Sequence, residues 1–229
     1  GAGMRPDELL RAGNLSLGAV APDREAAVEA LHKFLQRPTL AGRTETRALS
    51  PSARTRVAAP GRESWLTVVV GVDPVPDPAA LDVAAALLAA RARDALEGLE
   101  VELLRHFVPG RPVLLMLVGG PAPLPEVEAR VAAAWPKLRA RVREEEVAAV
   151  RRRVAADHAT ATGGALGRAT ACAAMAAGEG GFRPGEEAEM AILTSPAEAV
   201  GAILATIGPW DAQETTGAGI LPISRLDQP

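Results

Sequence analysis

The sequence predicts an α+β domain, with a mixed or antiparallel sheet of five or six strands and helices packed mainly on one face. Runs of β-branched residues alternate with amphipathic helical stripes in the first half of the chain, and helical patterns fill most of the second half. Hydrophobic residues make up 48% of the 229 residues but aromatic residues only 3%, so we expect Ala, Val and Leu to build the core.

Composition argues against several classes of protein. The net charge is −3 and the arginines are scattered, which does not indicate a nucleic-acid-binding surface. Cys172 is the single cysteine, so the chain has no intrachain disulfide and no multi-cysteine zinc module. No apolar run approaches the roughly 20 residues that a membrane-spanning helix needs.

We expect one domain over residues 13–223, with a tag remnant and N-terminal arm at 1–12 and a tail at 224–229. The compartment stays open at this point. The protein is cytoplasmic if Met4 is the native start, and periplasmic or secreted if a signal peptide has been removed.

The first predicted unit is a strand followed by a helix. Residues 15–20 form a short apolar run, and the helix after Asp23 ends before Pro38. Its apolar stripe consists of Ala27, Val28, Leu31, Phe34 and Leu35. Residues 39–56 are polar and show no periodicity, so we interpret them as an exposed loop.

The second predicted unit has clearer signals. Residues 65–72 are a β-branched run typical of a central strand. Asp77 is a good N-cap with Pro78 at the first helical position, and Gly98 is placed to end the helix. The helix face expected to be buried carries Leu81, Ala84, Ala85, Leu88 and Ala92.

A hairpin and a third helix follow. Strands at 99–108 and 112–118 are joined by Pro109-Gly110, which suits the central positions of a type II turn. The third helix has apolar residues at helical spacing, and Pro136 is expected to loosen its last turn. Its stripe is Val127, Val131, Ala134, Trp135 and Leu138.

A charged helix is predicted at 144–161. We expect the acidic run at 144–146 not to touch the arginines at 151–153, because they lie seven positions apart. Gly163-Gly164 then break the helix before an Ala-rich one, whose small side chains should pack closely on another element. That face carries Ala169, Cys172, Ala173 and Ala176, with Cys172 expected to be buried.

The last part of the chain is predicted to form a loop, a helix and a strand. Residues 178–185 are interpreted as a flexible loop. Residues 195–198 have the pattern of a capping box that opens a helix. The stripe of this helix is Val200, Ile203, Leu204 and Ile207. A short strand is predicted at 219–223.

This order and spacing resembles the C-terminal, non-catalytic domain of the pitrilysin or insulinase-like zinc peptidases, the family that includes mitochondrial processing peptidase. The resemblance extends over roughly residues 13–223 and implies the fold of one half of a zinc peptidase. The stretches that carry it are residues 17–23, 65–72, 77–96, 144–147, 195–198 and 220–222.

Members of that family usually have two such domains per subunit, and the first binds zinc through a His-x-x-Glu-His motif. In this motif two imidazoles one helical turn apart bind the ion, and the carboxylate acts as general base. His32, His106 and His158 have no second histidine at that spacing. The resemblance therefore implies no catalytic residues, no metal ligands and no cofactor in this chain, with zinc only in a partner domain. We predict that the chain is not an enzyme on its own.

The second domain of such peptidases can hold substrate through an arginine and a tyrosine near the turn after the central helix. Arg91 and Arg93 lie in the corresponding region and are the candidates for contact with a substrate or a partner. The chain contains no tyrosine, which argues against substrate assistance by such a pair.

The leading hypothesis is a non-catalytic, peptidase-like domain that pairs with a zinc-bearing domain of the same fold and completes or stabilises it. Two alternatives stay open. The chain is the C-terminal half of a longer zinc peptidase, or it is a stand-alone structural homodimer. We expect neither nucleic acid nor a membrane as a partner.

Overall fold

A computed structural model of the chain describes residues 21–36, 54–59, 61–72, 77–108, 111–177 and 185–221. The chain divides into two compact units. The first, here the helical unit, comprises Gly1–Leu49 and Ala156–Glu189, and the second, here the sheet unit, comprises Ser50–Ala155 and Met190–Pro229. The single domain predicted over 13–223 stays a prediction.

The sheet unit contains a mixed sheet of five strands, in the order β1-β5-β2-β4-β3. Strand β1 pairs with β5 in parallel, and all other neighbours are antiparallel. The strands are β1 (Arg54–Ala58), β2 (Ser64–Gly71), β3 (Glu100–Val108), β4 (Arg111–Gly120) and β5 (Glu214–Gly219). The predicted hairpin is the β3–β4 pair.

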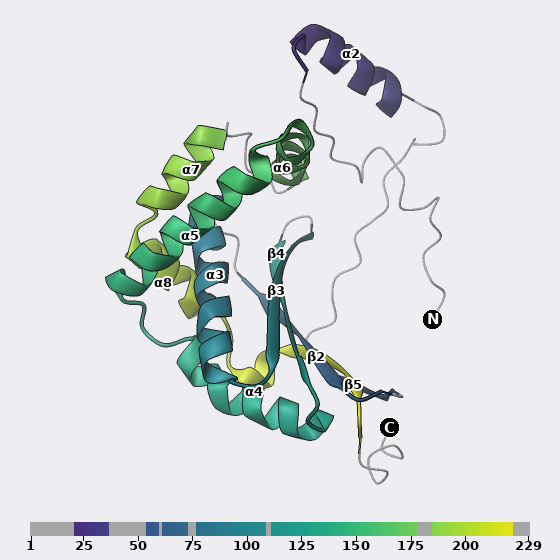
Figure 1. Cartoon of the computed structure of the whole chain (residues 1–229), viewed down its shortest axis with the longest axis vertical. Coiled ribbons are helices and arrows are strands. Elements are labelled where there is room, and N and C mark those ends of the chain that lie inside the picture. Colours follow the sequence, from purple (N-terminus) through teal and green to yellow (C-terminus); the bar gives the residue numbers. More distant parts are fainter. Residues whose placement is uncertain are drawn as a thin grey trace. The chain divides into compact units, whose positions relative to one another are not determined.

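Helices of the sheet unit lie on one face of this sheet, as Figure 1 shows for α3 and α4. Helix α3 also packs against α8. The helices of the chain are α2 (Arg24–Leu35), α3 (Pro78–Ala95), α4 (Leu124–Leu138), α5 (Glu144–Thr162), α6 (Ala165–Ala177), α7 (Gly185–Thr194) and α8 (Ala197–Thr206). A short 3-10 helix covers Trp210–Ala212. This arrangement confirms the predicted α+β class.

Burial alternates along β2 and separates the two faces of the sheet. Ser64, Leu66, Val68 and Val70 are buried, whereas the residues between them are half-buried. The buried set belongs to the core that α3 and α4 complete. We call this side the helix face, and the opposite side, which carries Trp65, the outer face.

Local sequence signals determine where the central helix α3 begins and ends. The Asp77 carboxylate accepts a hydrogen bond from the Ala79 N–H at 3.0 Å, and Pro78 is the first helical residue. Gly98 has a φ of +79°, a left-handed conformation that suits glycine and turns the chain into β3. The predicted stripe of α3 is buried, and so are the predicted stripes of α4 and α8.

Two strands differ from the prediction. Residues 54–56, assigned to a loop, belong to β1, and the last strand lies at 214–219 instead of 219–223. Both strands are poor in apolar residues. Strand β1 forms because its arginines have partners: Arg56 binds the Glu128 carboxylate on α4 and donates to Thr215 Oγ1 at 2.9 Å.

The connection into α8 also differs. Helix α7 was not predicted, and Ser195 does not form a capping box. Its hydroxyl donates instead to the Ala191 carbonyl at 2.9 Å, and Pro196 is the N-cap of α8 without a side-chain hydrogen bond. The side chain of Ser195 therefore closes the end of α7.

Two predictions about side chains are wrong. Cys172 on α6 is half-buried instead of buried, as are Ala169 and Ala173. Arg151 does reach Glu144, with 2.9 Å between guanidinium and carboxylate, because two long side chains bridge two helical turns. The strand predicted at 15–20, the turn at 109–110 and the loop at 178–184 lie outside the described residues.

Candidate functional site

Arg91 lies where three helices of the sheet unit meet. It extends from α3, its side chain is 11% exposed, and it has four acceptors. The guanidinium donates to the carbonyls of Leu138 at 3.1 Å, Ala140 at 2.8 Å and Arg141 at 3.2 Å, and to the Glu146 carboxylate at 3.0 Å. Arg91 therefore joins α3 to the end of α4 and the start of α5.

The chemistry of this junction follows from the helix ends. The last carbonyls of a helix have no partner within the helix, and a guanidinium offers five donors in a fixed plane. One arginine can thus satisfy several carbonyls from Leu138 onwards and still pair with a carboxylate. Lysine has the charge but not this geometry.

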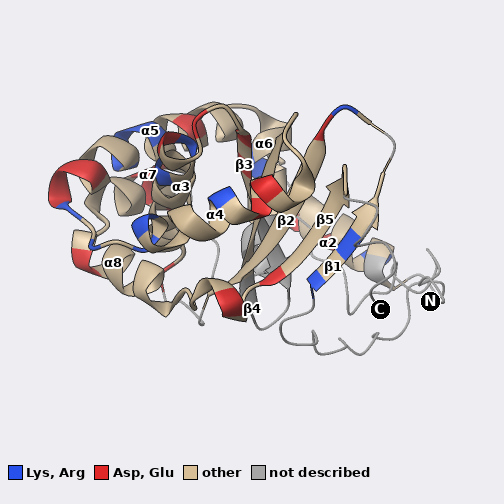
Figure 2. Cartoon of the chain, turned by 90° about the horizontal axis from the view of Figure 1, so that it is seen from below, with Lys and Arg blue, Asp and Glu red and all other residues tan. Residues whose placement is uncertain are grey.

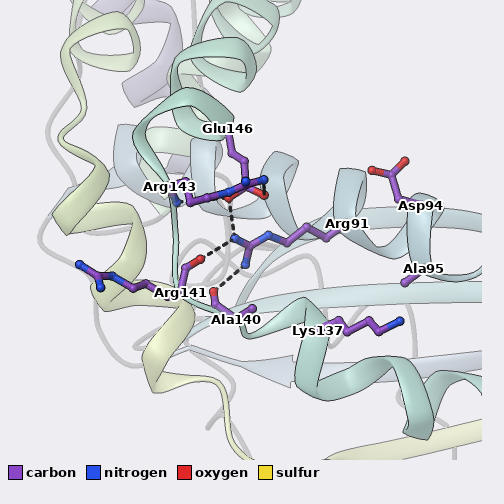
Figure 3. A pocket seen from close by; sticks show the side chains of 8 residues that line it. All are labelled: Arg91, Asp94, Ala95, Lys137, Ala140, Arg141, Arg143 and Glu146. Atoms are coloured by element: carbon purple, nitrogen blue, oxygen red, sulfur yellow. Dashed lines mark hydrogen bonds and ion pairs between the residues drawn. The ribbon is translucent and has the colours of Figure 1, made fainter.

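A cavity of about 410 Å³ opens beside Arg91, and Figure 3 shows its lining. Arg143 pairs with Glu146 at 3.3 Å, whereas Lys137 and Arg141 extend away from the Arg91 guanidinium. The lining residues are Arg91, Asp94, Ala95, Lys137, Ala140, Arg141, Arg143 and Glu146. The cavity is thus rimmed by both signs of charge, and its most buried arginine is already engaged.

The ionisation of Glu146 reflects two opposing causes. Burial disfavours the charged carboxylate, but hydrogen bonds from Arg143 and Arg91 outweigh it and hold the pKa of Glu146 below its ordinary value. The carboxylate is therefore charged at neutral pH, when it pairs with both arginines.

Arg93 lies two residues further along α3 and points to another side of the helix. It is exposed, and its Nε donates to the Val101 carbonyl on β3 at 3.3 Å. The structure thus does not bring Arg91 and Arg93 together. Their predicted contact with a substrate or partner stays a prediction. The pairing of Glu146 with Arg91 was not predicted, because the two residues lie 55 positions apart in the sequence and the chain path brings them together.

The histidines do not form a metal site within the described part of the chain. His32 is exposed on α2, His158 lies on α5, and His106 is in register with Val113 in the sheet. Among the described residues, no three His, Cys, Asp or Glu side chains lie close enough to hold one ion. The described residues therefore offer no ligand set for a catalytic zinc ion.

The outer face of the sheet carries apolar side chains that are partly exposed. Strand register places its side chains in rows across the sheet. One row runs from Glu100 across Gly119 and Trp65 to Ala218, the next from Glu102 across Leu117 and Thr67 to Thr216, and the third from Leu104 across Leu115 and Val69 to Glu214. Trp65, Val69, Leu115 and Leu117 are half-buried, and Leu104 is 43% exposed.

Trp65 is the dominant side chain of this face. A Cβ on Gly119 would lie 2.4 Å from the indole ring, so the ring rests directly on the glycine of the neighbouring strand. At the β1 edge of the same row, Val57 is 50% exposed. Figure 2 shows charged residues of both signs on α5, whereas β2 and β5 are mostly uncharged.

No single helix among the described residues is long and apolar enough to cross a bilayer. Helices α7 and α8 meet the length and composition criteria only as a pair, and they are bent by 84° at their junction.

Neither a protein-family model nor a curated protein matches the sequence. Known structures do match the fold. The inactive domain of an M16 peptidase from Pseudomonas fluorescens superposes with a TM-score of 0.64 at 16% identity, over 93% of this chain and 55% of that chain. A chain of complex III2 from Candida albicans with Inz-5 bound gives 0.60 at 14% identity, over 89% and 55%. A protease from Helicobacter pylori gives 0.59 at 12%, over 86% and 52%.

This chain spans about half the length of each of these proteins. At such identities the structural similarity shows a shared fold and says nothing about activity. It confirms the fold that the resemblance to the insulinase-like peptidases implied, whereas the likeness to mitochondrial processing peptidase and the C-terminal position stay predictions. The chain has the fold of the M16 peptidase domains.

Proposed function

We propose that this chain is a non-catalytic, M16-like domain that pairs with a zinc-bearing domain of the same fold and stabilises it. The observation that carries the proposal is the outer face. It is apolar and half-exposed, in a chain that spans about half the length of proteins with this fold. Apolar patches of this kind mark interaction sites.

The proposal assigns zinc and catalysis to the partner domain. This chain has no His-x-x-Glu-His motif, and its described residues contain no alternative ligand set. Arg91 serves the junction between α3, α4 and α5, and Arg93 is the more accessible candidate for contact with the partner or its substrate.

The partner domain belongs either to a separate subunit or to the same longer polypeptide. A reading frame that extends upstream with His-x-x-Glu-His supports the longer polypeptide, and a neighbouring gene with this motif supports the separate subunit. A stand-alone homodimer is the third arrangement, in which both copies use the same surface.

Co-expression with the protein that carries the motif tests the proposal. We expect a stable complex in size-exclusion chromatography with light scattering, and peptidase activity that requires zinc in the partner. A strictly monomeric chain that captures neither the zinc-bearing protein nor a second copy contradicts it.

A further inference from the structure

Basic residues are concentrated where α4 ends and the chain leads into α5. Four of the seven residues at 137–143 are lysine or arginine, in a chain whose net charge is −3. They are Lys137, Arg139, Arg141 and Arg143. Three of these four line the cavity of about 410 Å³ beside Arg91. The cavity is therefore a site of local positive charge on a chain that is acidic as a whole.

The lining of this cavity suits a charged ligand and not an apolar one. Ala95 and Ala140 are its uncharged residues, and the other six are four cations and two carboxylates, which leaves a surplus of two positive charges. The volume lies within the range of about 300–1,000 Å³ that is typical of small-molecule sites. Such sites are mostly lined by apolar side chains, so this lining favours a compact anion.

Two of the four cations are free to meet a ligand. Arg91 and Arg143 both pair with the Glu146 carboxylate, at 3.0 Å and 3.3 Å. Lys137 and Arg141 are exposed, and in the described part of the chain neither side chain has a hydrogen bond or an ion pair. Figure 3 shows these two side chains on opposite sides of the Arg91 guanidinium. An anion in the cavity can thus pair with them without breaking an existing contact.

The backbone beneath these side chains is held in place by Arg91. Its guanidinium occupies the carbonyls of Leu138, Ala140 and Arg141, whose oxygens would otherwise repel an anion. A segment that is already fixed loses less conformational entropy when a ligand binds. Arg91 therefore prepares the segment for an anion, although its own donors are engaged.

We propose that this cavity binds a small oxyanion with two negative charges, either a phosphate group or a dicarboxylate. Lys137 and Arg141 contact the ligand, Arg143 adds positive charge, and Arg91 is a positioning residue. A guanidinium offers paired donors to two oxygens, and the flexible stem of lysine lets its ammonium turn towards the ligand. The inference goes beyond the proposed pairing with a zinc-bearing domain and does not depend on it.

Isothermal titration of the purified chain with inorganic phosphate and with succinate tests this inference, at about pH 8, where both anions carry two charges. Sodium chloride keeps the ionic strength constant during each titration. We expect saturable binding of one ligand per chain, which weakens at least about threefold when the salt is raised from about 0.02 M to 0.2 M. The anion that binds more tightly identifies the source as a phosphate group or a dicarboxylate.

The double variant Lys137→Gln/Arg141→Gln should weaken binding at least about tenfold, because it removes both free cations. The two side chains are exposed and unpaired, so the fold should be kept, and a melting curve checks this. The matched control is Arg62→Gln/Arg152→Gln, which removes the same charge at exposed positions that do not line the cavity. It should bind the anion within about twofold of the unmodified chain.

The inference is overturned if neither anion binds saturably, if the double variant binds as tightly as the unmodified chain, or if the control weakens binding as much as the double variant. The titration does not require the zinc-bearing protein. Its failure therefore rejects the anion site and leaves the proposed pairing to its own test.

Discussion

Arg91 determines how α4 and α5 follow each other in the sheet unit. Its four acceptors are three carbonyls near the end of α4 and the Glu146 carboxylate. The resemblance to a peptidase half made Arg91 a candidate for contact with a substrate or a partner, but sequence patterns say nothing about the carbonyls that a side chain will meet. Only the chain path between α4 and α5 reveals this role.

We expect Arg91→Lys to lower the free energy of unfolding by about 1–3 kcal/mol, because an ammonium cannot satisfy the same set of carbonyls. Urea unfolding followed by circular dichroism measures the change. Arg93→Lys is the control, since Arg93 is exposed and donates one described hydrogen bond. Equal losses of unfolding free energy for the two variants would show that Arg91 does not stabilise the junction of α3, α4 and α5.

Glu146 should make stability depend on acid pH. Its folded-state pKa is lowered from 4.5, so its contribution is present above that value and is lost as the pH falls through the lower, folded-state pKa. The difference in unfolding free energy between the unmodified protein and Glu146→Gln should therefore be steady from about pH 7 to 5 and shrink below about pH 4. Urea titrations across this range test it. A difference in unfolding free energy that grows towards low pH would contradict the lowered pKa of Glu146.

At the scale of elements, the outer face depends on the contact of β2 with β4. Gly119→Ala should destabilise the fold by about 1–3 kcal/mol, because the added Cβ meets the Trp65 ring at 2.4 Å and forces it to move. Gly164→Ala is the control, since nothing lies within 4 Å of a Cβ there. Thermal melting and the fluorescence of the tryptophans report the two effects. An unchanged melting temperature for Gly119→Ala would show that the Trp65 ring does not lie against Gly119.

Elements with local signals were predictable from the sequence. Helix α3 has its N-cap, its first proline and its apolar stripe, and the stripe of α4 is buried as expected. Strands β1 and β5 lack such signals because partners distant in sequence stabilise them. Arg56 is held by α4, and Gly217 of β5 lets Leu124 approach to 2.7 Å from where a Cβ would be. Pairing of this kind overrides local propensity.

The candidate surface was less predictable than the fold. The sequence and its family resemblance predicted pairing with a partner, but not the face that we propose for it. That face follows from strand register, which brings Trp65, Leu117 and Glu102 from three strands onto one side. A one-residue change of register would turn these side chains towards the helices.

For the whole molecule, stability should respond to the partner and not to zinc. A partner that binds only the folded chain stabilises it by about 2.7 kcal/mol at a free concentration of 100 Kd. We therefore expect added zinc alone to leave the melting temperature unchanged and the zinc-bearing protein to raise it. Elemental analysis after dialysis should find well under one equivalent of zinc. A tightly held equivalent would place a metal site in this chain.

The place of β5 in the sheet also affects how the protein is made. Among the described strands, β1 pairs with β5 alone, and β5 separates it from β2. While the ribosome is still translating the helices, β1 has no neighbour and one edge of β2 is bare. The sheet becomes complete only when residues 214–219 emerge, after the helices from α3 to α8. All three rows of the outer face therefore exist only after β5 has paired, so a partner that contacts all of them can bind the complete sheet but not the growing chain.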